Sequence, residues 1–255
     1  MRPFSRTLIA LVATLAVAGA AAGETPGAQP VVAPDRPDLA DGIQIVPRGH
    51  FQIEAGTTLA WAGDTEVLTV GEVMVRLPWS ERVETRFQIL NYGVTWGEES
   101  LHGFFDPAVD VKWKLFDSAA TDFGLIVGST LPLGEKVYRN RHLQPYATLV
   151  LDRALCDRAA FSLNLGGASV SGPDETIQVV SGGLSFAFQL SSKLTAFLEG
   201  YAWDRTEPGG PGEQVLDGGL QFLLNDRLAL DVRVGTGFGR TADDGFVGVG
   251  AAFLF

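Results

Sequence analysis

Charged side chains of both signs recur at every second position of segments that are otherwise apolar. Asp110, Lys112 and Lys114 follow this spacing within one such segment. In a strand, alternate side chains point to the same face. Charged groups on that face can line a polar passage or pair into an ionic network, but they cannot face hydrocarbon, where Arg or Lys at mid-depth costs ~2–4 kcal/mol. We predict a lumen-lining set of Glu54, Glu72, Arg76, Glu84, Arg86, Asp110, Lys112, Lys114, Glu199, Tyr201, Asp217, Asp231 and Arg233.

No arrangement of residues in the sequence points to catalysis. His50, His102 and His142 lack a His-x-x-x-His spacing, and the single cysteine, Cys156, gives zinc no second thiolate. A Gly-x-Ser-x-Gly elbow is also missing. We therefore predict no enzyme activity, no cofactor and no metal. A lipid-modifying barrel with a Ser/His pair on adjacent strands stays open as a less favoured alternative.

The elements that must position the charged set are strands. About twelve strand-like segments separated by turn signals run through the chain, at 50–61, 66–77, 82–95, 104–116, 121–132, 143–153, 159–170, 176–190, 193–204, 213–225, 227–239 and 245–255. Soluble and membrane barrels share this period of two, so the alternation alone does not separate them. Their connections alternate between long, Gly- and acid-rich loops and tight turns, which is typical of outer-membrane barrels. We predict an all-β, antiparallel transmembrane barrel with both termini in the periplasm.

The last segment supports this interpretation. Its apolar face ends in Phe253 and Phe255, and its opposite face, which includes Gly250, is almost stripped of side chains. This arrangement is similar to the C-terminal sorting strand of bacterial outer-membrane proteins. It implies the bacterial outer membrane as location, with outer-membrane lipid and the barrel-assembly machinery as partners.

The N-terminus predicts export. Arg2 and Arg6 precede an apolar run over 8–17 and then small residues, as in a cleaved signal peptide. We expect a signal peptide at 1–22, a Pro-rich periplasmic leader at 23–49 and the barrel at 50–255. The formal charge of −11 becomes −13 without Arg2 and Arg6, which argues against nucleic acid as a partner.

Short Gly/Pro motifs carry a family resemblance over nearly the whole mature chain. The Asp35-Arg36-Pro37-Asp38 segment is followed by the Val46-Pro47-Arg48-Gly49 turn and by Gln52, Glu54 and Gly56 of the first strand. Later matching pieces are Gly103-Phe104-Phe105-Asp106, Leu131-Pro132-Leu133-Gly134, Gln144-Pro145, Asn164-Leu165-Gly166 and Phe246-Val247-Gly248-Val249-Gly250. The chain thus resembles a family of outer-membrane transporters associated with the MetA pathway of phenol degradation. The resemblance implies uptake of aromatic or other hydrophobic compounds.

From these observations we expect an outer-membrane channel or transporter for a small solute, and a structural barrel without an open path is the alternative. The leader residues Asp35 and Arg36 are candidate site residues, and we expect Arg36 to fold back onto interior carboxylates such as Glu54. Three aromatic residues, Phe197, Tyr201 and Trp203, fall on the predicted inner face. They either line a path for an apolar solute or fill space in a narrow barrel.

Overall fold

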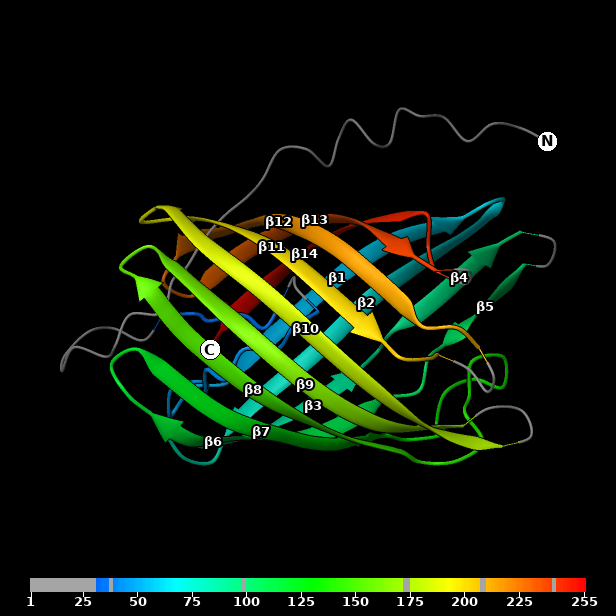
Figure 1. Cartoon of the computed structure of the whole chain (residues 1–255), viewed down its shortest axis with the longest axis horizontal. Helices are drawn as coiled ribbons and strands as arrows, with labels where there is room; N and C mark the ends of the chain where they lie inside the picture. The colour runs from blue at the N-terminus through cyan, green and yellow to red at the C-terminus, as the bar shows by residue number, and fades with distance from the viewer. Residues whose placement is uncertain (1–30, 37–38, 98–99, 172–174, 207–209, 240–241) are drawn as a thin grey trace.

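The computed structural model describes residues 31–36, 39–97, 100–171, 175–206, 210–239 and 242–255, so the predicted signal peptide and residues 23–30 of the leader lie outside it. The regular structure of the described residues consists of strands (Figure 1). These are β1 (Gln52–Ala62), β2 (Thr65–Pro78), β3 (Val83–Ile89), β4 (Tyr92–Trp96), β5 (Leu101–Phe104), β6 (Ala108–Asp117), β7 (Thr121–Thr130), β8 (Gln144–Cys156), β9 (Ala159–Ser171), β10 (Thr176–Ser191), β11 (Leu194–Trp203), β12 (Glu213–Asn225), β13 (Leu228–Phe238) and β14 (Gly245–Leu254).

The strands close into one antiparallel barrel. Each strand from β6 to β14 pairs with the next, and β1 closes the ring by pairing with both β14 and β2. β3 and β4 both pair with β2, one after the other, and they are the two halves of one interrupted spanning strand. β5 and β6 are likewise two halves, because they pair with β4 and β3 respectively. The barrel therefore has twelve spanning strands, which confirms the predicted fold class.

Two of the expected segments, 82–95 and 104–116, are broken in the structure. The first break falls at Leu90, whose φ of 55° is unusual for a residue with a side chain, and the facing Glu72 has a φ of 41°. Gly71 lies against this break, where a Cβ would stand 2.0 Å from the Leu90 carbonyl oxygen. A bulge of this kind bends a strand and redirects a side chain. Here it redirects Glu72, as described below.

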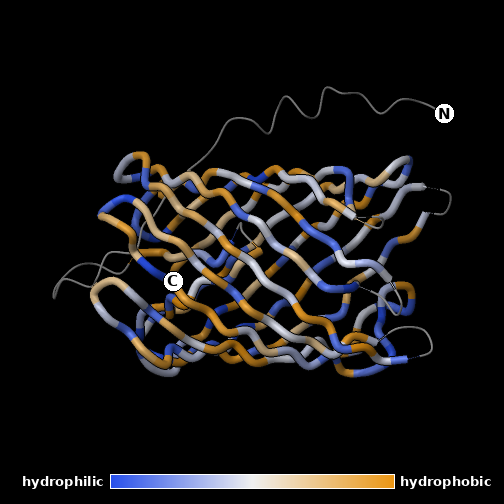
Figure 2. Tube along the Cα trace, viewed as in Figure 1, coloured by the Kyte–Doolittle hydropathy of each residue, from blue (hydrophilic) through white to orange (hydrophobic). Residues whose placement is uncertain are grey.

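The two faces of the wall have the inverted polarity of a membrane barrel. Asp110 and Lys112 are buried toward the axis, whereas Trp113 is 50% exposed and Phe253 is 39% exposed on the outside. Hydrophobic and hydrophilic stretches alternate along the strands (Figure 2). This inversion confirms the feature on which the sequence prediction depends.

The described residues contain no helix that is long and apolar enough to cross a membrane.

The ends of the barrel differ in the way the sequence predicted. Tight turns join β6 to β7, β8 to β9, β10 to β11 and β12 to β13 at one end, near which the C-terminus lies (Figure 1). The longer connections gather at the other end. In outer-membrane barrels, short turns face the periplasm and long loops face the exterior, and we use these names for the two ends.

Candidate functional site

The described part of the leader lies inside the barrel. It starts at the periplasmic end, where the Val32 N–H donates to the carbonyl oxygen of Asp226 at 2.8 Å, in the β12–β13 turn. Farther along, the N–H groups of Leu39 and Ala40 donate to the Glu199 carboxylate at 2.7 Å and 2.6 Å, near the middle of β11. The chain then returns to β1 (Figure 1). The segment that the sequence predicted to be a periplasmic leader is thus, over residues 31–36 and 39–49, a plug in the periplasmic half of the lumen.

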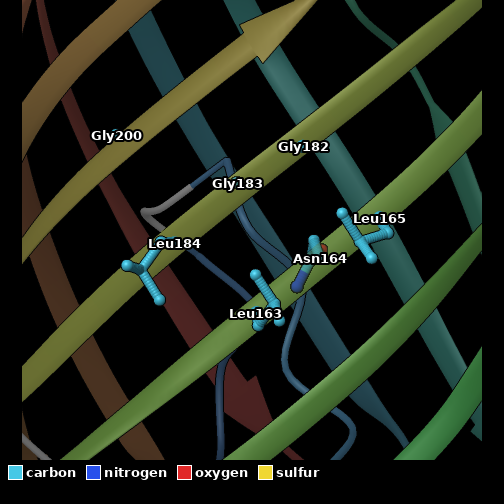
Figure 3. Close-up of a pocket in the computed structure, with 7 residues that line it drawn as sticks. All are labelled: Leu163, Asn164, Leu165, Gly182, Gly183, Leu184 and Gly200. Carbon is cyan, nitrogen blue, oxygen red and sulfur yellow. The ribbon is translucent and has the colours of Figure 1, made fainter.

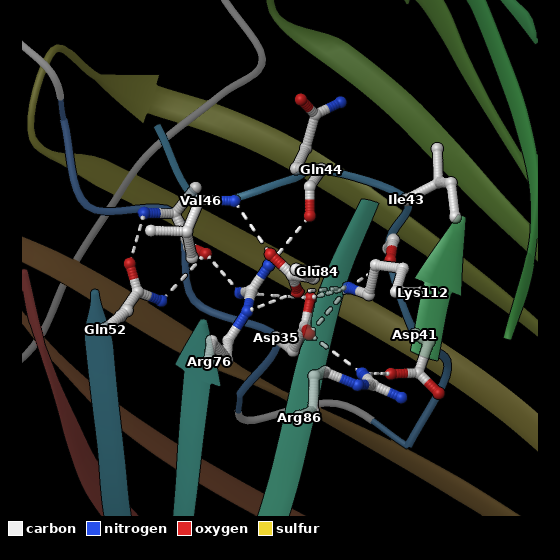
Figure 4. A network of polar contacts seen from close by, with 12 residues as sticks. Asp35, Asp41, Ile43, Gln44, Val46, Gln52, Arg76, Glu84, Arg86 and Lys112 are labelled. Carbon is white, nitrogen blue, oxygen red and sulfur yellow. Dashed lines mark hydrogen bonds and ion pairs between the residues drawn. The ribbon is translucent and has the colours of Figure 1, made fainter. Parts of the chain in front are cut away.

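Asp35 is the centre of an ionic network (Figure 4). Its carboxylate accepts from Lys112 Nζ at 2.7 Å and 2.6 Å and from Arg86 Nη1 at 2.9 Å, and it pairs with Arg76 Nη1 at 3.3 Å. Burial alone would raise the pKa of Asp35, but the charges of Arg76, Lys112 and Arg86 outweigh burial and hold it well below its ordinary value. One carboxylate of the leader is therefore the shared anion of three bases of the wall.

The three bases are also paired within the wall. Arg76 donates to Glu84 at 2.8 Å and to Glu54 at 3.1 Å. Arg86 donates to Asp110 at 2.7 Å, and it also contacts Asp41 of the leader. Because carboxylates and bases alternate in this network, each buried charge has an opposite charge beside it, as buried ions require.

The backbone of the leader is satisfied by side chains of the wall. Glu54 accepts the N–H groups of Asp35 and Arg36 at 3.1 Å and 3.0 Å, and Glu84 accepts the N–H of Val46 at 2.8 Å. A buried segment outside any sheet must find such partners for its N–H groups. The wall carboxylates therefore hold the leader along its length.

Sequence reasoning missed several residues of this contact surface, including Asn164, Asp152 and Asp41. Asn164 accepts the Asp41 N–H at 2.9 Å, and Asp152 accepts the Ile43 N–H at 2.8 Å. The sequence could have predicted these two residues, because each lies an even number of positions from an inward-facing residue of its own strand and so points to the same face. The third residue, Asp41, belongs to the leader, which has no periodicity from which its orientation could be predicted.

Arg36 fills a cradle in the wall opposite Asp35. Its Nη1 donates to Glu72 at 2.7 Å, and its Nε lies 3.6 Å from Asp231. The bulge in β2 places Glu72 there. The guanidinium group thus pairs with Glu72 and Asp231, whereas Glu54, the partner suggested from the sequence, accepts the backbone N–H of Arg36.

Two glycines make room for this guanidinium. A Cβ on Gly56 would lie 2.2 Å from Arg36 Nη2, and a Cβ on Gly250 would lie 2.5 Å from Arg36 Nε. This contact explains why the inner face of the last strand is nearly free of side chains. The outer face of the same strand carries Phe253 and Phe255, whose rings are 4.6 Å apart.

Above the plug, the extracellular half of the lumen contains a chamber of about 220 Å³. Its floor includes Leu39 of the leader, and its walls include Trp203, Val215, Arg233 and Phe246. Arg233 Nη2 donates to Thr58 at 3.2 Å, and its guanidinium carbon lies 5.2 Å from the centre of the Phe246 ring. The chamber therefore combines an apolar wall with one cation.

The remaining predicted lumen residues lie around these two regions. Lys114 pairs with Asp122 at 3.1 Å near the periplasmic end. Asp217 is buried beside its cross-strand neighbour Glu199, close below the chamber. Together with the contacts described above, this places every member of the predicted set on the inner side of the wall.

The three inner aromatic residues have different surroundings. Phe197 packs where a side chain on Gly219 would otherwise stand, so it fills space. Trp203 lines the chamber, and the centre of its ring lies 4.7 Å from that of Tyr201. The Tyr201 hydroxyl donates to Ser181 at 3.3 Å. Phe197 therefore fills space, whereas Trp203 lines the chamber and packs against Tyr201.

Acidic residues surround the outer side of the chamber. Glu213 and Asp243 both line it, and Asp244 accepts the Gly63 N–H at 2.7 Å nearby. Burial raises the pKa of Asp243, and the charges of Glu213 and Asp244 add to this effect. The chamber therefore has a cation near its floor and a cluster of anions toward its mouth.

A second depression, of about 240 Å³, lies on the outer surface of the wall (Figure 3). Leu163, Leu165 and Leu184 surround it, and Gly182 and Gly200 have no side chains to fill it. Asn164 is at its base, but the Asn164 side chain donates to the Asp41 carbonyl oxygen of the leader and so points inward. The depression belongs to the apolar, lipid-facing surface.

Two of the three histidines, His50 and His102, contact groups other than a serine hydroxyl. His50 Nδ1 contacts the Arg48 carbonyl oxygen at 3.3 Å, and His102 Nδ1 contacts the Tyr92 hydroxyl at 2.9 Å. Within the described part of the chain, His, Cys, Asp and Glu do not form a cluster that could hold a metal ion.

Solved structures share this architecture at low sequence identity. The outer membrane channel COG4313 from Pseudomonas putida F1 matches with a TM-score of 0.68 and 12% identity, over 84% of this chain and 98% of that chain. The NanC porin matches with a TM-score of 0.56 and 9% identity, and the KdgM porin with 0.54 and 8%; each match covers 80% of this chain and 98% of the porin. A search of curated proteins found no match.

The closed wall, its apolar outer face and these structural neighbours define a transmembrane β-barrel with the fold of outer-membrane channels and porins. The profile of the family described as "Putative MetA-pathway of phenol degradation" matches residues 34–255, and the chain belongs to that family. The match begins at the leader, next to Asp35 and Arg36.

Proposed function

We propose that this barrel is a passive channel for small solutes, including aromatic ones, in which the leader controls passage through the periplasmic half. The observation that carries the proposal is the division of the lumen. An open chamber faces the exterior, and the segment that fills the space below it is held by side chains and does not belong to the sheet. Such a segment can shift without breaking the barrel wall.

Three further observations support the proposal, two on the class of solute and one on the channel function. Trp203 and Phe246 give the chamber aromatic walls that suit an apolar ring. The family to which the chain belongs is described by a pathway of phenol degradation. The COG4313 protein, which has a similar fold, is an outer membrane channel.

Conductance in planar bilayers tests the proposal with the full chain. Asp35→Asn weakens the anchor of the leader because it removes the shared anion of Arg76, Arg86 and Lys112. We expect small steps from the wild type and larger or more frequent steps from this variant. Asp157→Asn, in an exposed turn, is the matched control and should behave as the wild type does.

A structural barrel without a path is the rival function. Two results together would favour the structural barrel. The folded wild type and the folded Asp35→Asn variant would both give no conductance steps, and neither would take up phenol or a small sugar into liposomes. We also propose that the barrel has no enzymatic role, because His50 and His102 contact a backbone oxygen and a tyrosine instead of a nucleophilic serine.

A further inference from the structure

Among the described residues, the chamber contains the one lumen base that has no carboxylate partner at ion-pair distance. In the described chain, the other lumen bases each form an ion pair, namely Arg36, Arg76, Arg86, Lys112 and Lys114. Arg233 instead contacts the Thr58 hydroxyl and the face of Phe246, and its buried Nε has no hydrogen-bond partner. A guanidinium group in this position is ready to bind a carboxylate.

The acids of the same chamber exclude a simple anion as the preferred solute. Glu213 and Asp243 line the wall toward the mouth, and no lysine or arginine among the described residues forms an ion pair with Asp243. These acids repel an incoming anion, and Arg233 repels an incoming cation. A solute that carries both signs matches both ends of the chamber.

The space between the two ends is apolar. Trp203, Val215 and Phe246 line it, and Gly237 leaves the wall free of a side chain on β13. A ring or branched apolar group fits this lining better than a sugar, which needs hydrogen-bond partners along its length.

We propose that the extracellular chamber binds a zwitterionic amino acid with an aromatic side chain. Its carboxylate lies on Arg233, its ammonium group lies toward Glu213 and Asp243, and its ring lies against Trp203 and Phe246. This inference rests on the proposed channel function and specifies the solute that the chamber selects.

Three probes that share a phenylethyl group test the assignment by calorimetry on the full-length protein in detergent. They are phenylalanine, 3-phenylpropionate, which lacks the ammonium group, and phenethylamine, which lacks the carboxylate. We expect phenylalanine to bind about tenfold or more tightly than either analogue, since each analogue loses one charge-assisted contact. Equal binding of phenylalanine and 3-phenylpropionate, or no binding of phenylalanine, would overturn the proposal.

Variants locate the binding. Arg233→Gln should weaken phenylalanine binding by about tenfold, whereas Arg227→Gln, in an exposed turn, should leave it unchanged. Asp243→Asn should weaken phenylalanine binding but not 3-phenylpropionate binding. The shift in gel migration between unheated and heated samples shows whether each variant is folded. The three probes on the wild type test the proposal even if a variant fails to fold.

The result is separable from the channel function. If phenylalanine does not bind but liposomes still take up phenol through the protein, the amino acid assignment falls and the channel stands. If no solute passes through either wild type or Asp35→Asn, the channel function falls as well.

Discussion

The two halves of the lumen solve the problem of buried charge in opposite ways. In the periplasmic half, carboxylates and bases of the wall pair with one another and with the leader, where Asp35 is shared by three wall bases and Arg36 pairs with Glu72. In the extracellular half, Arg233 and Asp243 face the same chamber, and neither forms an ion pair with another described residue. The first half is therefore filled by its own chain, whereas the second half contains an open chamber.

Removal of Asp35 should produce the largest difference between the halves. Asp35→Ala leaves three buried bases without their shared anion, and loss of one partner from a buried ion pair typically costs about 3–5 kcal/mol. Arg233→Gln, in the chamber, should change the free energy of unfolding by less than about 1 kcal/mol, because it breaks no ion pair. Urea unfolding in detergent or lipid measures both values, and equal losses would contradict the division.

Filling the Arg36 cradle should loosen the leader without changing any charge. Gly250→Val puts atoms where the guanidinium lies, and overpacking of this kind typically costs about 1–3 kcal/mol. We expect bilayer conductance to rise and the variant to unfold at lower urea. The control is Gly200→Ala on the outer surface, where a Cβ would meet its nearest atom at 4.0 Å. An unchanged Gly250→Val channel would show that the cradle does not hold the leader.

Tyr201→Ala should have a smaller effect that is confined to the chamber. The Tyr201 ring supports Trp203, at 4.7 Å between ring centres, so its loss lets the chamber wall relax. Liposome uptake of phenol should change more than uptake of a small sugar. If both rates change by the same factor, the aromatic wall does not contribute to selection.

The smallest expected effect is a dependence of chamber binding on pH. Burial and the charges of Glu213 and Asp244 raise the pKa of Asp243, so its protonated form is favoured over that in the unfolded chain. As the pH falls, Asp243 therefore becomes neutral at a higher pH than an ordinary aspartate does, and it then no longer attracts an ammonium group. Arg233 keeps its charge over the same range. Phenylalanine affinity should fall as the solution is made acidic, and it should fall less in Asp243→Asn. Calorimetry at several pH values checks this, and identical profiles would remove Asp243 from the site.

The wall could be predicted well from the sequence, and the contents of the lumen could not. Alternation at Asp110, Lys112 and Trp113 identified which side chains face the axis, because a strand has a period of two. The same alternation did not predict the interruption at Leu90. The backbone there has a positive φ, which a leucine in the sequence does not predict.

By itself, the sequence determined a barrel with charges inside and apolar side chains outside, since charged side chains that face hydrocarbon are costly. Only the tertiary structure decided where the described part of the leader lies and that Asp35 joins Arg76, Arg86 and Lys112. It also decided that Arg233 has no carboxylate partner at ion-pair distance among the described residues. The physical reason is that the two-residue repeat of a strand predicts which face a side chain points to, but it does not predict which residue across the lumen it contacts. An aperiodic segment such as the leader finds its place only when the closed wall presents donors and acceptors to it.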